Sequence, residues 1–127
     1  MEQAKPYIHL VDGRRVALVR SDMRTVLQKV LFEPDRVCEV MDVPGGRGGV
    51  LRFALPDGWG VLRKYQRGGV IRHFVRDGYV LDNRPRRELD ILAFLKAREL
   101  PVAEPLGAYW ERKGPWIRGA LATRWVD

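Results

Sequence analysis

The chain has 127 residues, 46% of them hydrophobic, and a formal net charge of +7. A chain of this length can bury one hydrophobic core, so we expect one compact domain. It has no run of about 18 apolar residues and a single cysteine, Cys38, which argues against a spanning helix and excludes an internal disulfide. His9 and His73 are far apart and no Cys/His cluster has metal-ligand spacing, so we expect no metal site. The polar residues 1–5 do not resemble a secretory signal, and we expect a cytoplasmic protein.

The amino-terminal part reads as a hairpin followed by a helix. Two β-favouring runs, 7–11 and 16–20, flank Asp12-Gly13, a dipeptide suited to a tight turn. The next segment places Met23, Val26, Leu27, Val30 and Leu31 on one helical face before Pro34. We treat residues 1–36 as an amino-terminal extension.

Residues 37–127 predict an α+β unit with a five-stranded antiparallel sheet and one packed helix. The strand runs are 37–43, 50–55, 59–65, 105–112 and 116–125. A glycine cluster separates the first two runs, and Pro56-Asp57-Gly58 separates the next two. Asn83 is a plausible helix cap and Pro85 suits a first turn, so the helix is expected from about 85 to 98.

The glycine cluster is the first candidate for binding chemistry. Glycines between two strands let backbone N–H groups approach phosphate oxygens, because no Cβ blocks the way. An ordinary flexible hairpin loop is the alternative. The cluster consists of Gly45, Gly46, Arg47, Gly48 and Gly49.

Glu88 and Arg63 form the second candidate. Glu88 shares a helical stripe with Ile91, Leu92 and Leu95, which would direct its carboxylate toward the core. A buried carboxylate needs a cation, and alternation places Arg63 on the strand face opposite Leu62 and Lys64. Glu88 could equally lie at the edge of the stripe and be solvated.

A glycine loop, a strand cation and a helix carboxylate, in that order, form the amino-lobe arrangement of protein kinases. Over about residues 43–127 the chain resembles the Kdo (3-deoxy-D-manno-octulosonic acid) kinases of the lipopolysaccharide kinase family. The matching strings are Gly45-Gly46-Arg47-Gly48, the segment 61–69 (VLRKYQRGG), Tyr79, the segment 87–92 (RELDIL) and the segment 100–105 (LPVAEP).

The resemblance implies an ATP- and Mg²⁺-dependent transfer of phosphate to the Kdo sugar of lipid A-anchored core, at the cytoplasmic face of the inner membrane. By resemblance, Val61, Arg63 and Glu88 join the glycine loop in the ATP site. Thr123 would lie at the back of the adenine pocket, and Trp125 and Val126 would begin the hinge. Arg63 replaces the lysine of protein kinases, which makes the expected phosphate contact a planar fork.

No H-x-D-x-x-x-x-N or D-F-G-like string follows these motifs in the sequence. We therefore assign no catalytic residue and no metal ligand to this chain, and expect a carboxyl lobe to supply them.

Positive charge concentrates in residues 63–87, with eight Lys or Arg against two Asp, a net charge of +6. Cations in the first turn of a helix are disfavoured by the macrodipole, so a nearby anion would relieve them. A phosphorylated glycolipid or an anionic membrane would serve, and a solvated charged face is the alternative. The candidate residues are Arg67, Arg72, Arg84, Arg86 and Arg87.

Two other functions stay open. A small basic nucleic-acid-binding module would use Tyr65, Phe74 and Tyr79 among the arginines, although no nucleic-acid signature accompanies them and we expect no nucleic acid. A non-catalytic kinase-like interaction domain is the second. A downstream H-G-D-L-N-like string in the coding sequence would favour the kinase.

Overall fold

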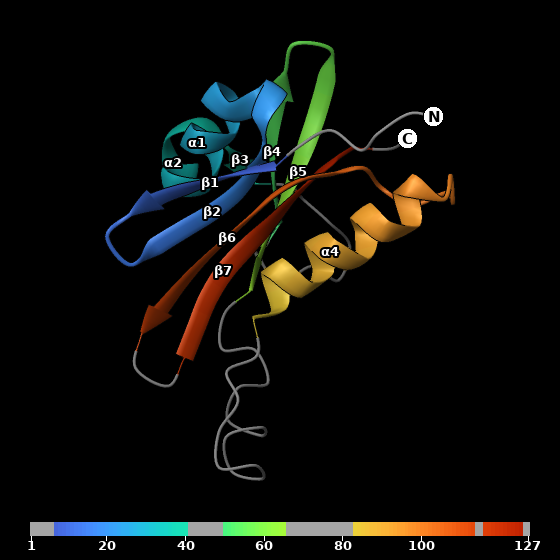
Figure 1. The fold of residues 1–127 in the computed structure, drawn as a ribbon. Helices are drawn as coiled ribbons and strands as arrows, with labels where there is room; N and C mark the ends of the chain where they lie inside the picture. The colour runs from blue at the N-terminus through green and yellow to red at the C-terminus, as the bar shows by residue number, and fades with distance from the viewer. Residues whose placement is uncertain (1–6, 41–49, 66–82, 114–115, 126–127) are drawn as a thin grey trace, which may run out of the picture.

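The computed structural model describes residues 7–40, 50–65, 83–113 and 116–125. Figure 1 shows a broad twisted sheet with helices on both of its faces. The elements in chain order are β1 (Tyr7–Asp12), β2 (Arg15–Arg20), η1 (Ser21–Met23), α1 (Arg24–Phe32), α2 (Pro34–Val37), β3 (Glu39–Val40), β4 (Val50–Leu55), β5 (Gly58–Tyr65), α4 (Arg84–Ala97), β6 (Pro105–Lys113) and β7 (Trp116–Arg124).

The sheet is antiparallel, and its seven strands follow the order β1-β2-β6-β7-β5-β4-β3 (Figure 1). The prediction of a five-stranded sheet was therefore wrong in strand number. Strand β2 pairs with β6, with Arg15 opposite Glu111 and Val19 opposite Gly107, so the hairpin continues the sheet. Without β2, one edge of β6 would expose a row of backbone N–H and C=O groups. The hairpin pairs with these groups through β2. The division of the chain at residue 36 stays a prediction.

Both predicted turns in the described ranges are confirmed. Gly13, between β1 and β2, has φ +65°, a conformation that other residues adopt only with strain. Gly58, after Pro56 and Asp57, has φ +155° and opens β5. These two glycines fix where the chain reverses, and thereby the register of both hairpins.

Helices α1 and α2 cover one face of the sheet. Leu27, Val30 and Leu31 of α1 are buried there, as their spacing predicts. They pack in the larger of two cores, with side chains from β2, β4, β5, β6 and β7: Val19, Phe53, Leu62, Leu106, Ala120 and Ala122.

Helix α4 covers the other face. It begins as predicted, because the Asn83 side chain accepts a hydrogen bond from the Arg86 N–H at 3.2 Å and Pro85 lies in the first turn. The smaller core beneath it consists of Leu18, Leu89, Ala108 and Leu121.

The buried stripe of α4 differs from the predicted one. Pro85 and Leu89 are buried, whereas Ile91, expected inside, is 46% exposed. Gly119 of β7 explains why α4 turns Pro85 and Leu89 toward the sheet and not the predicted stripe. A Cβ there would lie 2.6 Å from Cγ of Pro85, so the missing side chain lets Pro85 sit directly on the strand. Glu88 therefore lies at the edge of the packed stripe.

Of the helices in the described part of the chain, none is long and apolar enough to cross a membrane.

Candidate functional site

Strand β5 sorts its side chains between the two faces of the sheet. Leu62 is fully buried in the core beneath α1, and Lys64 Nζ lies 3.8 Å from Asp35 Oδ1 of α2. Because side chains alternate along a strand, Val61 and Arg63 face the α4 side. The pairing of β5 with β7 agrees with this placement, because Arg63 is opposite Leu121, a member of the core beneath α4. Cross-strand partners share a face.

Arg63 and Glu88 thus belong to the same side of the sheet but do not form an ion pair. In the described ranges no contact within 4.0 Å joins them, and Glu88 Oε1 instead lies 3.6 Å from Arg84 Nε, one helical turn earlier. Arg63 is exposed and Glu88 half-buried, so water can solvate both charges. Glu88 therefore lies at the edge of its stripe and is partly solvated, which is the second of the two predicted placements.

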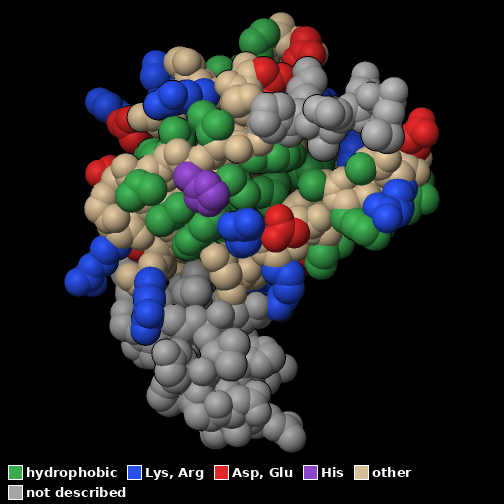
Figure 2. Space-filling view, in the orientation of Figure 1, with side chains coloured by type: hydrophobic (Ala, Val, Ile, Leu, Met, Phe, Trp, Pro, Cys, Tyr) green, Lys and Arg blue, Asp and Glu red, His purple; other side chains and the backbone are tan. Residues whose placement is uncertain are grey.

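Thr123 and Val61 lie on this face too. They are cross-strand partners in β7 and β5, and both are half-buried. Just beyond, the Trp125 N–H donates to the Trp59 carbonyl oxygen at 2.9 Å and fastens the end of β7 to the start of β5. Val61, Arg63 and Thr123 therefore share one surface. Figure 2 shows hydrophobic side chains between the β1–β2 hairpin and α4, with charged side chains around them.

Other predicted residues fall outside the described ranges, and their roles stay predictions. These residues are Gly45, Gly46, Arg47, Gly48, Gly49, Arg67, Arg72 and Val126.

Two of the first-turn arginines of α4, Arg84 and Arg86, have ion-pair partners within the helix. Arg84 approaches Glu88 as described, and Arg86 Nε lies 3.2 Å from Asp90 Oδ2. The Arg86 guanidinium also lies over the Trp110 ring, 6.0 Å from its centroid. Arg87 is exposed. Their part in binding an anionic substrate stays a prediction.

An ion-pair network around the buried Arg20 ends beside the predicted hinge, and the sequence pattern did not reveal it. Arg20 is 4% exposed and pairs with Asp22, at 2.7 Å, and with Glu104. Glu104 also accepts from Arg124 Nε at 3.0 Å. Its partners lie 84 residues before it and 20 residues after it, and no local periodicity encodes such separations.

The network reaches the β4–β5 turn through Asp57. Arg124 Nη1 donates to Asp57 Oδ1 at 3.0 Å, and this hydrogen bond holds the pKa of the Asp57 carboxyl below its ordinary value. The Arg124 N–H also donates to the Glu104 carbonyl oxygen at 2.9 Å. Through Arg124, the end of β7 is therefore connected to Glu104, just before β6, and to Asp57 in the β4–β5 turn.

The structure is a sheet-dominated domain with helices on both faces of one seven-stranded antiparallel sheet, and a cation-bearing strand and α4 lie on the same side of it. The family model described as "Lipopolysaccharide kinase (Kdo/WaaP) family" matches residues 35–127. The chain belongs to the lipopolysaccharide kinase (Kdo/WaaP) family.

Curated relatives agree with this assignment. A protein named 3-deoxy-D-manno-octulosonic acid kinase from Xanthomonas campestris pv. campestris is 40% identical over 120 residues, which is 87% of this chain and 47% of that protein. A protein of the same name from Stenotrophomonas maltophilia is 35% identical over 87 residues, 65% of this chain and 35% of that protein. The chain thus spans about half the length of the Xanthomonas relative. No solved structure matches it significantly.

Proposed function

We propose that this chain is the nucleotide-binding amino lobe of an ATP-dependent kinase that phosphorylates the Kdo sugar of the lipopolysaccharide inner core. The single observation that supports it most is the shared face of Val61, Arg63 and Thr123 beside α4, in a chain whose relatives bear the name of that kinase. A nucleic-acid-binding module would suit the basic segment, but the family match makes it the weaker alternative.

In this proposal, Arg63 binds the α- and β-phosphates of ATP. Its guanidinium is exposed on the α4 side, and a planar fork can donate two parallel hydrogen bonds to one phosphate group. A movement of α4 that brings Glu88 from Arg84 to Arg63 would orient the guanidinium. Val61 and Thr123 would contact the adenine, with Trp125 and Val126 as the hinge, and the glycine loop would cover the phosphates.

The Arg20–Glu104–Arg124 network would position the hinge next to this site. Arg124 immediately precedes the hinge residue Trp125, so its ion pairs fix the direction in which the chain leaves β7. A fixed exit would hold the adenine-binding backbone in place.

Bound Mg²⁺ would neutralise charge on the transferred phosphoryl group. Among the described residues no group of three or more His, Cys, Asp or Glu could hold a metal ion, so we assign the magnesium ligands to none of them. We assign the catalytic base and those ligands to a carboxyl lobe. The acceptor would be Kdo-lipid A, approached at the cytoplasmic face of the inner membrane by a peripheral protein of net charge +7.

The test is transfer of labelled phosphate from ATP to a Kdo-lipid A acceptor. Two proteins are compared: this chain, and this chain fused to the carboxyl portion of the Xanthomonas campestris relative beyond the matched region. We expect transfer by the fusion and none by the chain alone, since positioned metal ions and an orienting carboxylate are needed. Transfer by the unextended chain, or no transfer by a folded fusion, would reject the proposal.

A further inference from the structure

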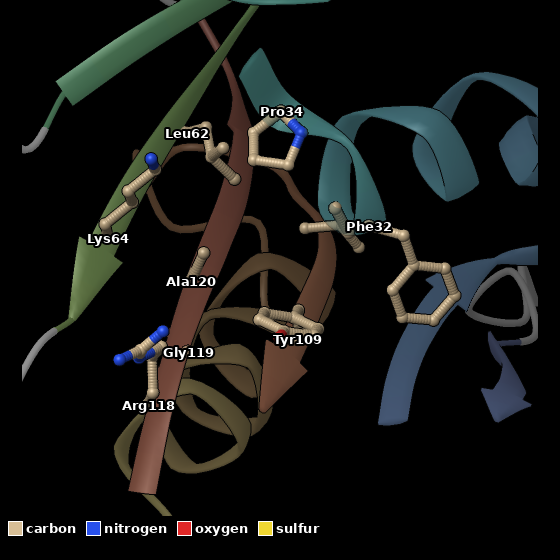
Figure 3. A pocket seen from close by; sticks show the side chains of 9 residues that line it. Phe32, Pro34, Leu62, Lys64, Tyr109, Arg118, Gly119 and Ala120 are labelled. Carbon is tan, nitrogen blue, oxygen red and sulfur yellow. The ribbon is translucent and has the colours of Figure 1, made fainter. Parts of the chain in front are cut away.

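A pocket of about 190 Å³ opens on the face of the sheet opposite Arg63 (Figure 3). It lies between α1–α2 and strands β5, β6 and β7. The apolar part of its wall consists of Leu31, Pro34, Leu62, Ala120 and the ring of Tyr109. A cavity of this size can enclose a small apolar group.

Two cations from neighbouring strands stand at one side of this pocket. Lys64 is the register partner of Ala120, and Arg118 lies two residues before Ala120 on the same face of β7. Figure 3 shows both side chains beside the strands, across the pocket from Phe32 and Pro34.

Neither cation is strongly neutralised. Asp35 is the ion-pair partner of Lys64 at 3.8 Å, but its side chain is 92% exposed, and such pairs contribute little. Arg118 is exposed, and in the described ranges no carboxylate lies within 4.0 Å of its guanidinium. An anionic group could therefore bind both cations without displacing a buried partner.

Tyr109 and Glu111 limit how much negative charge the pocket accepts. The Tyr109 hydroxyl donates to Glu111 Oε1 at 2.9 Å. Burial, helped by this hydrogen bond, raises the pKa of Tyr109 to about 12, so the phenol stays neutral. Glu111 is the register partner of Arg118, and its carboxylate would repel a ligand with several anionic groups.

We propose that this pocket binds a compact apolar molecule that ends in one phosphate or carboxylate group. The anionic group contacts Lys64 and Arg118, and the apolar part lies against Leu31, Pro34 and Leu62. The site is separate from the predicted nucleotide face, because Lys64 and Arg63 project from opposite sides of β5.

The test uses hexyl phosphate as probe and isothermal titration calorimetry with the whole chain. Saturable one-to-one binding is expected, at least roughly tenfold tighter than inorganic phosphate and tighter than hexanol, since the apolar and anionic parts both contribute. Lys64→Met and Arg118→Met should each weaken binding about tenfold. Both positions lie at the rim of the pocket, and circular dichroism verifies that the variants are folded.

Arg24→Met is the matched control, because it removes an exposed arginine of α1 that does not line the pocket. It should leave hexyl phosphate binding unchanged. Loss of binding in Arg24→Met, equal affinity for inorganic phosphate or hexanol, or no saturable binding at low millimolar probe would each overturn the proposal.

Vesicles distinguish the two sources of such a ligand. Sedimentation with phosphatidylcholine vesicles that contain phosphatidic acid, lost in Lys64→Met, would assign the site to a lipid headgroup. Hexyl phosphate binding without sedimentation would assign it to a soluble ligand. Absence of both would overturn the proposal.

Discussion

Glu104→Gln tests how much of the fold depends on the buried network. The substitution keeps the size of the side chain and removes its charge. In the wild-type protein the carboxylate of Glu104 lies between the guanidinium groups of Arg20 and Arg124. In the variant, Arg20 would keep Asp22 as its one carboxylate partner, while remaining buried.

The expected cost is about 2 kcal/mol. Removing one partner of a fully buried ion pair costs roughly 3–5 kcal/mol, because the other charge is left buried. Two features lower the estimate here: the Glu104 side chain is 31% exposed, and Arg20 retains Asp22. The neutral amide can still accept one hydrogen bond. For a domain of this size the loss corresponds to a decrease in Tm of roughly 8 °C.

Urea unfolding followed by tryptophan fluorescence measures the change in free energy. Asp57→Asn is the matched control: it removes a carboxylate from the exposed end of the same network, where the Asp57 side chain is 69% exposed. It should change stability little. An unfolding free energy of Glu104→Gln within about 0.5 kcal/mol of wild type, the range of ordinary surface substitutions, would refute the reasoning.

Three further outcomes follow from single contacts. In Gly119→Ala the new Cβ would lie 2.2 Å from the Tyr109 carbonyl oxygen, so we expect destabilisation by about 1–3 kcal/mol and faster amide exchange in α4; wild-type stability would contradict this. Burial raises the pKa of Cys38 to about 11, so its alkylation at pH 8 should be far slower in the folded protein than in urea, and equal rates would contradict the burial. The lowered pKa of Asp57 contributes stability above the ordinary value of 3.8, and acid removes it as the pH falls through the folded-state pKa. The small stability loss expected of Asp57→Asn at neutral pH should therefore vanish in acid, and a loss that stays the same at all pH values would exclude this linkage.

Local patterns predicted the elements well. The three-and-four spacing of Leu27, Val30 and Leu31 identified α1 because burial against a sheet requires it. The turns at Gly13 and Gly58 followed from residues that accept positive φ. The pairing of β2 with β6 could not be predicted this way, because the two strands lie far apart in sequence. The backbone groups of either strand could pair with any open strand edge.

In the candidate site, too, local patterns predicted some features, and others depend on tertiary contacts. Alternation in β5 was enough to assign Arg63 and Lys64 to opposite faces. The periodicity of α4 was not enough to orient Glu88, because the rotation of the helix depends on Gly119, a residue of a strand that comes later in the chain. The ion pairs of Glu104 likewise depend on tertiary contacts.

The most direct test of the central claim, that the α4 side of the sheet binds ATP, is the kinase activity of the fused protein with Arg63→Ala. Arg24→Ala, an exposed arginine at the start of α1 on the other face, is the control. We expect Arg63→Ala to lower kcat/KM for ATP on the order of 10²-fold, as removal of a charge-stabilising donor does, and Arg24→Ala to leave it unchanged. Equal activity of the two variants would contradict the assignment of this face to nucleotide binding.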